Sequence, residues 1–173
     1  HCVLQSRTFF RPDCIAGLST SEKATITPAI ILPSATVESR HEGELLRASQ
    51  VQVLGIESSF WKLASTPSMQ VAELAEDQVA INAGLAKELN LNVGDELTLR
   101  FEKNSGVPAD NPLGRKDDAA INMPRQKVTA ILPDDSVGGL SLKAGQSVPK
   151  NIFVGLTSLQ MALESDGTIN AAW

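Results

Sequence analysis

Hydrophobic and polar positions are most regular between residues 79 and 102, where a helical period is followed by a strand period. Ile81, Leu85 and Leu89 recur at every fourth position, which predicts one apolar stripe on a helix of about two turns. Asn82 is placed to cap this helix, because its side-chain oxygen can accept a bond from the first turn.

The break after this helix is followed by strict alternation. Asn90 favours a left-handed helix end, and Leu97, Leu99 and Phe101 then alternate with polar residues. This predicts a strand with one buried face. Because every apolar residue here has a packing role, we interpret the stretch as scaffold and not as a site of chemistry.

Other segments are shorter and mix extended with helical patterns. Strands are predicted over residues 50–56, 127–132 and 151–156, from residue 168 onward, and as short extended pieces on either side of Pro33. Helical turns are predicted from Pro12, around Phe60 and Trp61, and over residues 157–165, where Thr157 and Gln160 have the capping-box spacing. A polar bend is predicted over residues 41–49.

This order of elements favours an α+β fold with one or more mixed sheets and short helices, which two subdomains could share. No internal repeat is visible. The segment 103–126 is rich in proline and glycine and lacks an apolar period, so it is predicted to be a flexible loop. Residues 133–149 form a second turn-rich segment.

Composition narrows the classes of function. The 15 basic and 20 acidic residues are interspersed and give a net charge of −5, so no electrostatic footprint for nucleic acid is present. Aromatic residues make up only 4% of the chain, which argues against a platform on which bases stack. No apolar run reaches the length of about 18 residues needed to span a membrane.

The chain lacks the residue patterns of an active site. Its two histidines, His1 and His41, lie far apart in sequence, and no metal-ligand spacing is present. Cys2 and Cys14 are equally compatible with a disulfide and with two free thiols. No nucleophile motif or phosphate loop is found, so we predict neither a catalytic residue nor a cofactor nor a metal, and a domain that is not itself an enzyme.

Two acidic pairs, Asp117 with Asp118 and Asp134 with Asp135, are the remaining candidates for acid/base chemistry or cation binding. Both lie in turn-forming sequence, where aspartate is favoured for backbone geometry. We therefore interpret them as turn residues. The chain also opens without methionine and ends inside a strand pattern, so we expect it to be a piece of a longer protein.

Four segments in this order resemble the MacB-like periplasmic core domain of FtsX-family ABC transporter permeases. They read VQVLGIESSFWKL, VAINAGLAKELNLNVGDELTLRF, VTAIL and KNIFVGLTSLQMAL, and the resemblance runs from about Val51 to Leu163. The second segment contains the pattern A-x-x-L-x-L-x-x-G-D before a strand, as in that family. The segment 103–126 is longer than the family pattern.

The resemblance implies that residues 1–173 are an extracytoplasmic domain of a permease in the cytoplasmic membrane, located in the periplasm or outside the cell. It implies a cytoplasmic ATPase subunit as partner of the parent permease, a second permease subunit, and a substrate or partner protein outside the membrane. The domain would relay ATP-driven movement of membrane helices. Candidate partner-contact loops are those around Arg115, Lys116, Asp117, Asp118, Asp134 and Asp135.

A permease ectodomain of this kind should have both chain ends on the same side of the fold, because both must re-enter the membrane nearby. The alternative is a soluble β-barrel module of the double-psi or cradle-loop type in a cytoplasmic enzyme or regulator, since the helix, turn and strand around Gly94 also occur there. Hydrophobic helices flanking the domain in the parent gene would distinguish the two.

Overall fold

The described chain is mostly β-strand with a few short helices, which confirms the α+β prediction. The computed structural model describes residues 3–16, 26–41, 43–63, 73–102, 120–141 and 148–173. The strands are β1 (Leu4–Phe10), β2 (Pro28–His41), β3 (Glu44–Ile56), β4 (Gln78–Asn82), β5 (Glu96–Glu102), β6 (Ala120–Leu132), β7 (Asn151–Gly155) and β8 (Ile169–Ala172). The helices are α1 (Asp13–Ala16), α2 (Ala83–Glu88) and α3 (Leu156–Leu163), with short 3-10 helices η1 (Ser58–Leu63) and η2 (Val137–Gly139).

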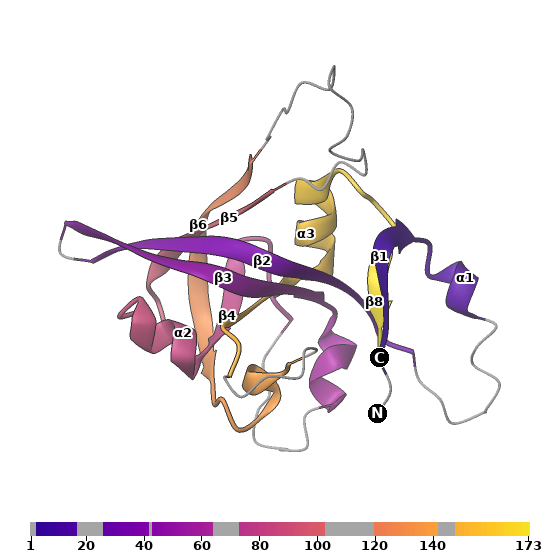
Figure 1. The fold of residues 1–173 in the computed structure, drawn as a ribbon, viewed down its shortest axis with the longest axis horizontal. Coiled ribbons are helices and arrows are strands. Elements are labelled where there is room, and N and C mark those ends of the chain that lie inside the picture. Colours follow the sequence, from indigo (N-terminus) through magenta and orange to yellow (C-terminus); the bar gives the residue numbers. More distant parts are fainter. Residues whose placement is uncertain (1–2, 17–25, 42, 64–72, 103–119, 142–147) are drawn as a thin grey trace.

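Six of these strands close into a ring (Figure 1). Around the ring the order is β2, β3, β7, β4, β6 and β5, and β5 pairs back onto β2. The β3–β7 and β4–β6 pairs are parallel and the other four are antiparallel. Strands β8 and β1 extend the sheet from the first residues of β2. The sheet is therefore mixed, as predicted.

The ring has an internal two-fold pattern that the sequence analysis did not detect. The series β2, β3, η1, β4, α2 is followed by the same series as β5, β6, η2, β7, α3. The strand pairings follow the same correspondence between halves: β3 pairs in parallel with β7, and its counterpart β6 pairs in parallel with β4. Each strand needs only alternating apolar and polar residues. The two halves can therefore repeat the same order of elements without a recognisable repeat in sequence.

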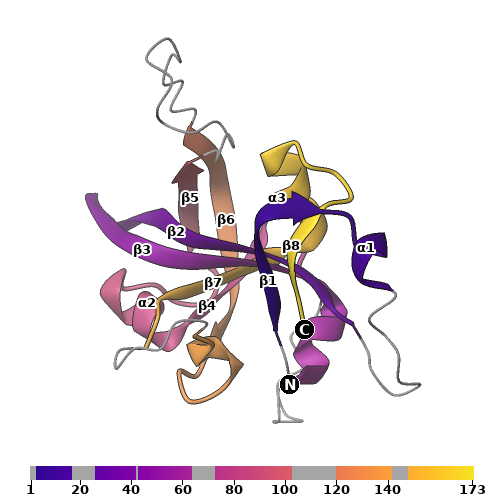
Figure 2. The ribbon, with the colours of Figure 1, turned by 45° about the vertical axis from the view of Figure 1, so that its right-hand side comes forward.

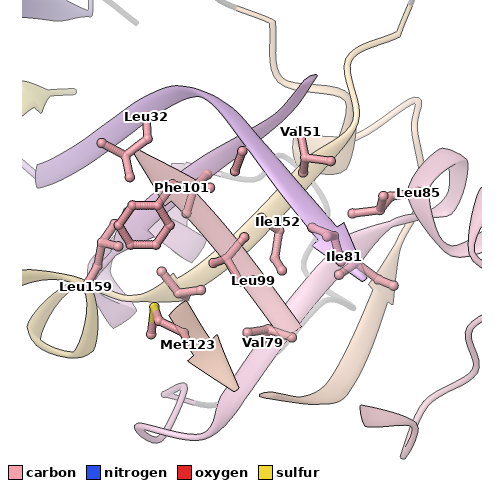
Figure 3. Close-up of a cluster of buried hydrophobic side chains, with 14 of the residues drawn as sticks. Leu32, Val51, Val79, Ile81, Leu85, Leu99, Phe101, Met123, Ile152 and Leu159 are labelled. Carbon is pink, nitrogen blue, oxygen red and sulfur yellow. The ribbon is translucent and has the colours of Figure 1, made fainter. Parts of the chain in front are cut away.

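The larger hydrophobic cluster fills the inside of the ring (Figure 3). Val79, Leu99 and Ile152 are fully buried there. Leu85 of α2 and Leu159 of α3 lie at opposite sides of this cluster in Figure 3, so the two helices cover the two ends of the ring.

A second cluster lies on the outer face of the central strands. Leu54 and Phe153 alternate with ring-facing neighbours and are fully buried against this second cluster. Phe60 of η1 is 1% exposed and its ring lies 5.0 Å from that of Trp173 and 5.5 Å from that of Trp61. Phe60 is therefore a core residue.

Strands β2 and β3 are both longer than predicted. The break expected at Pro33 is wrong, since β2 continues through it with register shifts between Leu32 and Val37. The predicted bend over residues 41–49 is also wrong beyond its first residues, because β3 begins at Glu44 and forms a long hairpin with β2. Proline lacks the N–H that a strand ladder uses, so a bulge is where a strand tolerates it.

The predicted loop 103–126 also needs correction. Residues 120–126 form the first half of β6 and pair with β5 from Glu102 to Leu97. Pro124 again lies beside a register shift, and Arg125 takes a left-handed backbone with φ of 52°. The apolar residues in this segment alternate around the bulge, which obscured the strand pattern. Residues 103–119 lie outside the described residues.

The region around Asn82 confirms some predictions and corrects others. Asn82 caps α2, with its Oδ1 accepting from the Leu85 N–H at 3.3 Å, and Asn90 has the predicted left-handed backbone. Ile81, however, lies in β4 and not on the helix. The predicted capping box of α3 is wrong, because Gly155 is the N-cap residue and no side chain caps the helix.

The two ends of the described chain lie side by side. β1 pairs antiparallel with β8, and Leu4 is opposite Ala172 in the register. In Figures 1 and 2 the hairpin of β2 and β3 points away from the chain ends. The expected adjacency of the chain ends is thus confirmed.

Candidate functional site

The predicted partner-contact residues fall into two groups. Arg115, Lys116, Asp117 and Asp118 lie outside the described residues. The other pair follows β6: Asp134 is half-buried, and Asp135 is exposed. Only this second pair can therefore be placed in the fold.

Asp134 has a structural role. Its Oδ1 accepts a hydrogen bond from Asn82 Nδ2 at 2.7 Å and another from the Gly84 N–H at 3.3 Å. The carboxylate thus lies at the start of α2, where it also compensates the positive end of the helix. Asp134 and Asp135 both lie in a turn, as predicted, but the Asp134 side chain bonds to β4 and α2 and not to its own turn.

A buried amide network surrounds this aspartate and was only partly foreseen. Asn82 is fully buried; its Oδ1 also accepts from the Asn151 N–H at 3.0 Å, and its Nδ2 donates to the Pro149 carbonyl at 2.9 Å. Asn151 Nδ2 donates to the Gly138 carbonyl at 2.8 Å and the Leu140 carbonyl at 2.9 Å. The network joins β4, β7 and the η2 turn. A capping position marked Asn82 in the sequence, but no local signal marked Asn151.

A polar cleft of about 460 Å³ lies between the β2–β3 hairpin, the turn after α2 and strands β5 and β6. We call it the arm cleft. Its charged and histidine lining residues are Glu38, Arg40, His41, Asp95, Glu96, Arg100 and Arg125. None of these residues was predicted as a site, because they come from three separate stretches of sequence that lie together only in the folded chain.

Ion pairs organise one wall of the arm cleft. The Glu38 carboxylate lies 3.2 Å from Arg100 Nη2 and 3.4 Å from Arg47 Nε, and the Glu38 side chain is only 11% exposed. Register explains this contact, since Glu38 is opposite Arg47 on β3 and opposite Thr98 on β5. At the base, Ser39 Oγ donates to the Leu89 carbonyl at 3.3 Å and ties the hairpin to the end of α2.

A second cleft of about 400 Å³ lies where α3 begins. Trp61 and Ser158 line it together with three glutamates, Glu57, Glu73 and Glu76. The glutamates are exposed, and two of them lie in the segment before β4. They line the same cleft as the first residues of α3, Leu156 and Thr157.

Within the described ranges, no group of three or more His, Cys, Asp or Glu residues is placed to hold a metal ion. Cys14 is an exposed free cysteine in α1, and Cys2 lies outside the described residues. His41 lines the arm cleft together with two hydroxyl residues, Ser39 and Thr98, and Ser39 Oγ donates to the Leu89 carbonyl.

None of the helices in the described part of the chain is both long and apolar enough to cross a membrane.

Comparison with solved structures identifies the fold. The crystal structure of the periplasmic region of MacB from Actinobacillus actinomycetemcomitans matches 98% of this chain with a TM-score of 0.52 and 11% sequence identity. The extracellular domain of YknZ, a noncanonic ABC-type transporter from Gram-positive bacteria, matches 99% of this chain with a TM-score of 0.55 and 11% identity. The chain has a MacB-like fold.

The likeness is one of structure and not of sequence. No known sequence family matches the chain, and no curated protein matches it. The chain spans 64% of the MacB periplasmic region and 81% of the YknZ domain. The MacB-like fold extends over nearly all of this chain, beyond the segment from Val51 to Leu163 on which the sequence resemblance was based.

Proposed function

We propose that this chain is the extracytoplasmic domain of an ABC transporter permease and relays ATP-driven movement of membrane helices to a substrate or partner protein. The observation that supports this most is the pairing of β1 with β8 in a MacB-like fold. A domain inserted between two membrane helices needs its first and last residues side by side. The β2–β3 hairpin then projects away from those ends (Figure 2).

The proposal includes the partners of such a permease. ATP would be hydrolysed by a separate cytoplasmic subunit, a second permease subunit would complete the membrane part, and this domain would act mechanically without catalysing a reaction. The loops around Arg115, Lys116, Asp117 and Asp118, together with Asp135, are our candidates for contact with the substrate or partner protein.

One structural feature supports the rigidity that a relay needs. The ring closes on itself, so displacement at one strand is transmitted through hydrogen bonds to every other strand of the ring. Asn170 strengthens the connection between the chain ends and the ring: its Oδ1 accepts from the Ile31 N–H at 2.7 Å and its Nδ2 donates to the Ile31 carbonyl at 2.9 Å. Movement of β8 is thereby coupled to β2.

A soluble β-barrel module would also have a closed ring. The test must therefore establish on which side of the cytoplasmic membrane the domain lies. Cys14 offers a reporter, because it is exposed on α1. In the full-length parent protein, with Cys2 and any other cysteine replaced by serine, we expect a membrane-impermeant maleimide to label Cys14 in intact cells. Cys14→Ser is the matched control and should remain unlabelled.

The outcome separates the two functions. Labelling of Cys14 before the cells are opened would support the extracytoplasmic assignment. Labelling only after the cytoplasmic membrane is permeabilised would refute it and favour a module of a cytoplasmic enzyme or regulator.

A further inference from the structure

The second cleft, where α3 begins, is lined by charge of one sign only. We call it the acidic cleft. Its lining contains the three carboxylates of Glu57, Glu73 and Glu76 and no lysine, arginine or histidine. Within the described part of the chain, none of these glutamate side chains forms an ion pair or a hydrogen bond. The fold therefore leaves three unpaired carboxylates around one cleft.

Positive charge nearby is too small to cancel this excess. The start of α3 has no side-chain cap and contributes roughly half a positive charge. Lys62 of η1 is exposed and is not a lining residue of the cleft. The sequence from 64 to 72 contains no charged residue. Even with the helix end and Lys62 both counted, the carboxylates are in excess.

Two oxygen atoms of the cleft lack a hydrogen-bond donor, which is an observation independent of charge. Ser158 is 8% exposed and lines the cleft, and its Oγ has no partner among the described residues. The Leu74 carbonyl likewise accepts no hydrogen bond from any described residue. A Cβ on Gly155 would lie 3.0 Å from the Leu74 oxygen and 3.2 Å from Ser158 Oγ, so both oxygens border the space over this glycine. Buried polar groups normally have a partner, and here an N–H donor is what is missing.

An aromatic ring is also part of the lining. Trp61 is half-buried, and the centre of its ring lies 5.5 Å from that of Phe60 and 5.6 Å from that of Phe153. These contacts fix the ring before any ligand binds. Indole attracts a cation more strongly than the other aromatic rings do, and its carbon surface packs against an alkyl chain. In the described ranges no acidic group is arranged to hold a metal ion, so an organic cation matches the cleft better.

We propose that the acidic cleft binds an organic cation, an ammonium or guanidinium group carried on a short alkyl chain. Its N–H groups donate to Ser158 Oγ and the Leu74 carbonyl, the glutamates balance its charge, and its alkyl chain packs on Trp61. A cleft of about 400 Å³ has the size of a small-ligand site. A free amine and a lysine or arginine side chain of a partner protein both supply this chemistry. The site does not depend on the transporter role.

Two probes with the same charge distinguish these sources. Butylguanidine is a free cation, whereas acetyl-Gly-Arg-Gly-amide carries the guanidinium on a peptide. Each is titrated at low salt into the complete 173-residue chain labelled with nitrogen-15, and the indole N–H signal of Trp61 in NMR spectra gives the dissociation constant. We expect at least one probe to bind at millimolar concentration. Tighter binding of butylguanidine identifies a free amine as the ligand, and tighter binding of the peptide identifies a partner side chain.

Substitutions in the cleft test the proposed contacts. Ser158→Ala removes an unpartnered hydroxyl and no internal bond, so it should weaken binding about threefold to tenfold without lowering the thermal midpoint of unfolding. Glu73→Gln should weaken binding by a similar factor. Glu44→Gln is the matched control, because Glu44 is exposed at the start of β3 and the substitution changes the net charge by the same amount. It should alter the dissociation constant less than about twofold.

A neutral probe tests whether the charge of the ligand matters. Acetyl-Gly-citrulline-Gly-amide has a urea group of the same shape in place of the guanidinium. The proposal is overturned if this peptide binds as tightly as the arginine peptide, or if neither cationic probe shifts the Trp61 signal at tens of millimolar concentration. It is also overturned if Ser158→Ala and Glu73→Gln bind the probes as tightly as Glu44→Gln does.

Discussion

Replacing Asn82 by alanine should destabilise the fold more than any exposed polar substitution. Asn82 is fully buried, and its amide makes bonds to four partners: the Leu85 N–H, the Asn151 N–H, the Asp134 carboxylate and the Pro149 carbonyl. The truncation removes all four and leaves no side chain that could replace them.

The magnitude follows from two of these contacts. Loss of the helix cap at Leu85 costs about 1 kcal/mol. The Asn151 N–H is buried and loses its acceptor, which costs about 2 kcal/mol more. We therefore expect Asn82→Ala to lower the free energy of unfolding by about 3 kcal/mol, a large part of the total of about 5–15 kcal/mol typical of a domain.

The assay is urea denaturation followed by tryptophan fluorescence. Both tryptophans, Trp61 and Trp173, pack against Phe60, so their emission reports loss of the outer cluster. Asn122→Ala is the matched control, because Asn122 is exposed on β6 and should change stability by less than about 0.5 kcal/mol.

Asn82→Asp tests the geometry of the network separately. Aspartate keeps the capping oxygen, but it places a second carboxylate where Nδ2 now lies 2.7 Å from Asp134. Asn82→Asp should therefore also destabilise the fold, because two carboxylates would face each other at hydrogen-bond distance. A loss below about 1 kcal/mol for Asn82→Ala, or no loss for Asn82→Asp, would refute the reasoning.

Two further predictions concern the core and the proposed contact loop. Leu99 is fully buried inside the ring, so Leu99→Ala should cost about 2–5 kcal/mol in the same urea assay, whereas Leu45→Ala at a 58% exposed position should cost less than about 0.5 kcal/mol; equal losses would contradict the assignment of the ring interior as the core. Under the proposed function, replacing Arg115, Lys116, Asp117 and Asp118 together by serine in the full-length parent protein should reduce transport or partner binding while ATP hydrolysis by the proposed associated subunit continues. Unchanged transport would remove these residues from the proposed contact surface.

The elements that could be predicted from sequence were those in which the apolar residues recur with one spacing, either that of a strand or that of a helix. Strand β5 buries one face only, so the alternation of Leu97 with polar neighbours identified it. Strand β4 was missed because both of its faces are covered, and its apolar run joined the helical spacing from Ile81 to Leu85. A short buried strand cannot be told from a helix by period alone.

The candidate site was less predictable for a different reason. The bond between Asn82 and Asp134 and the cleft between Arg40 and Arg125 join residues that are distant in sequence, and no local pattern encodes such contacts. Prolines inside two strands also obscured the full lengths of those strands in the sequence. Pro33 was expected to break a strand and Pro124 was assigned to the loop 103–126, whereas the register shifts in β2 and β6 let the ladders continue.

The exchange of strands between the two halves of the ring also determines when the chain can fold. Strand β3 cannot complete its pairing until β7 has been made. Gln52 of β3 pairs with Asn151, the first residue of β7, which belongs to the opposite half of the ring. Pairings this distant in sequence form slowly, because the intervening chain must be ordered before they close. A nascent chain that stops before residue 151 would hold β3 and β4 with exposed edges, since β7 is the strand that lies between them. Such edges recruit strands from other chains, so during synthesis this sequence is most exposed to aggregation until β7 has been made.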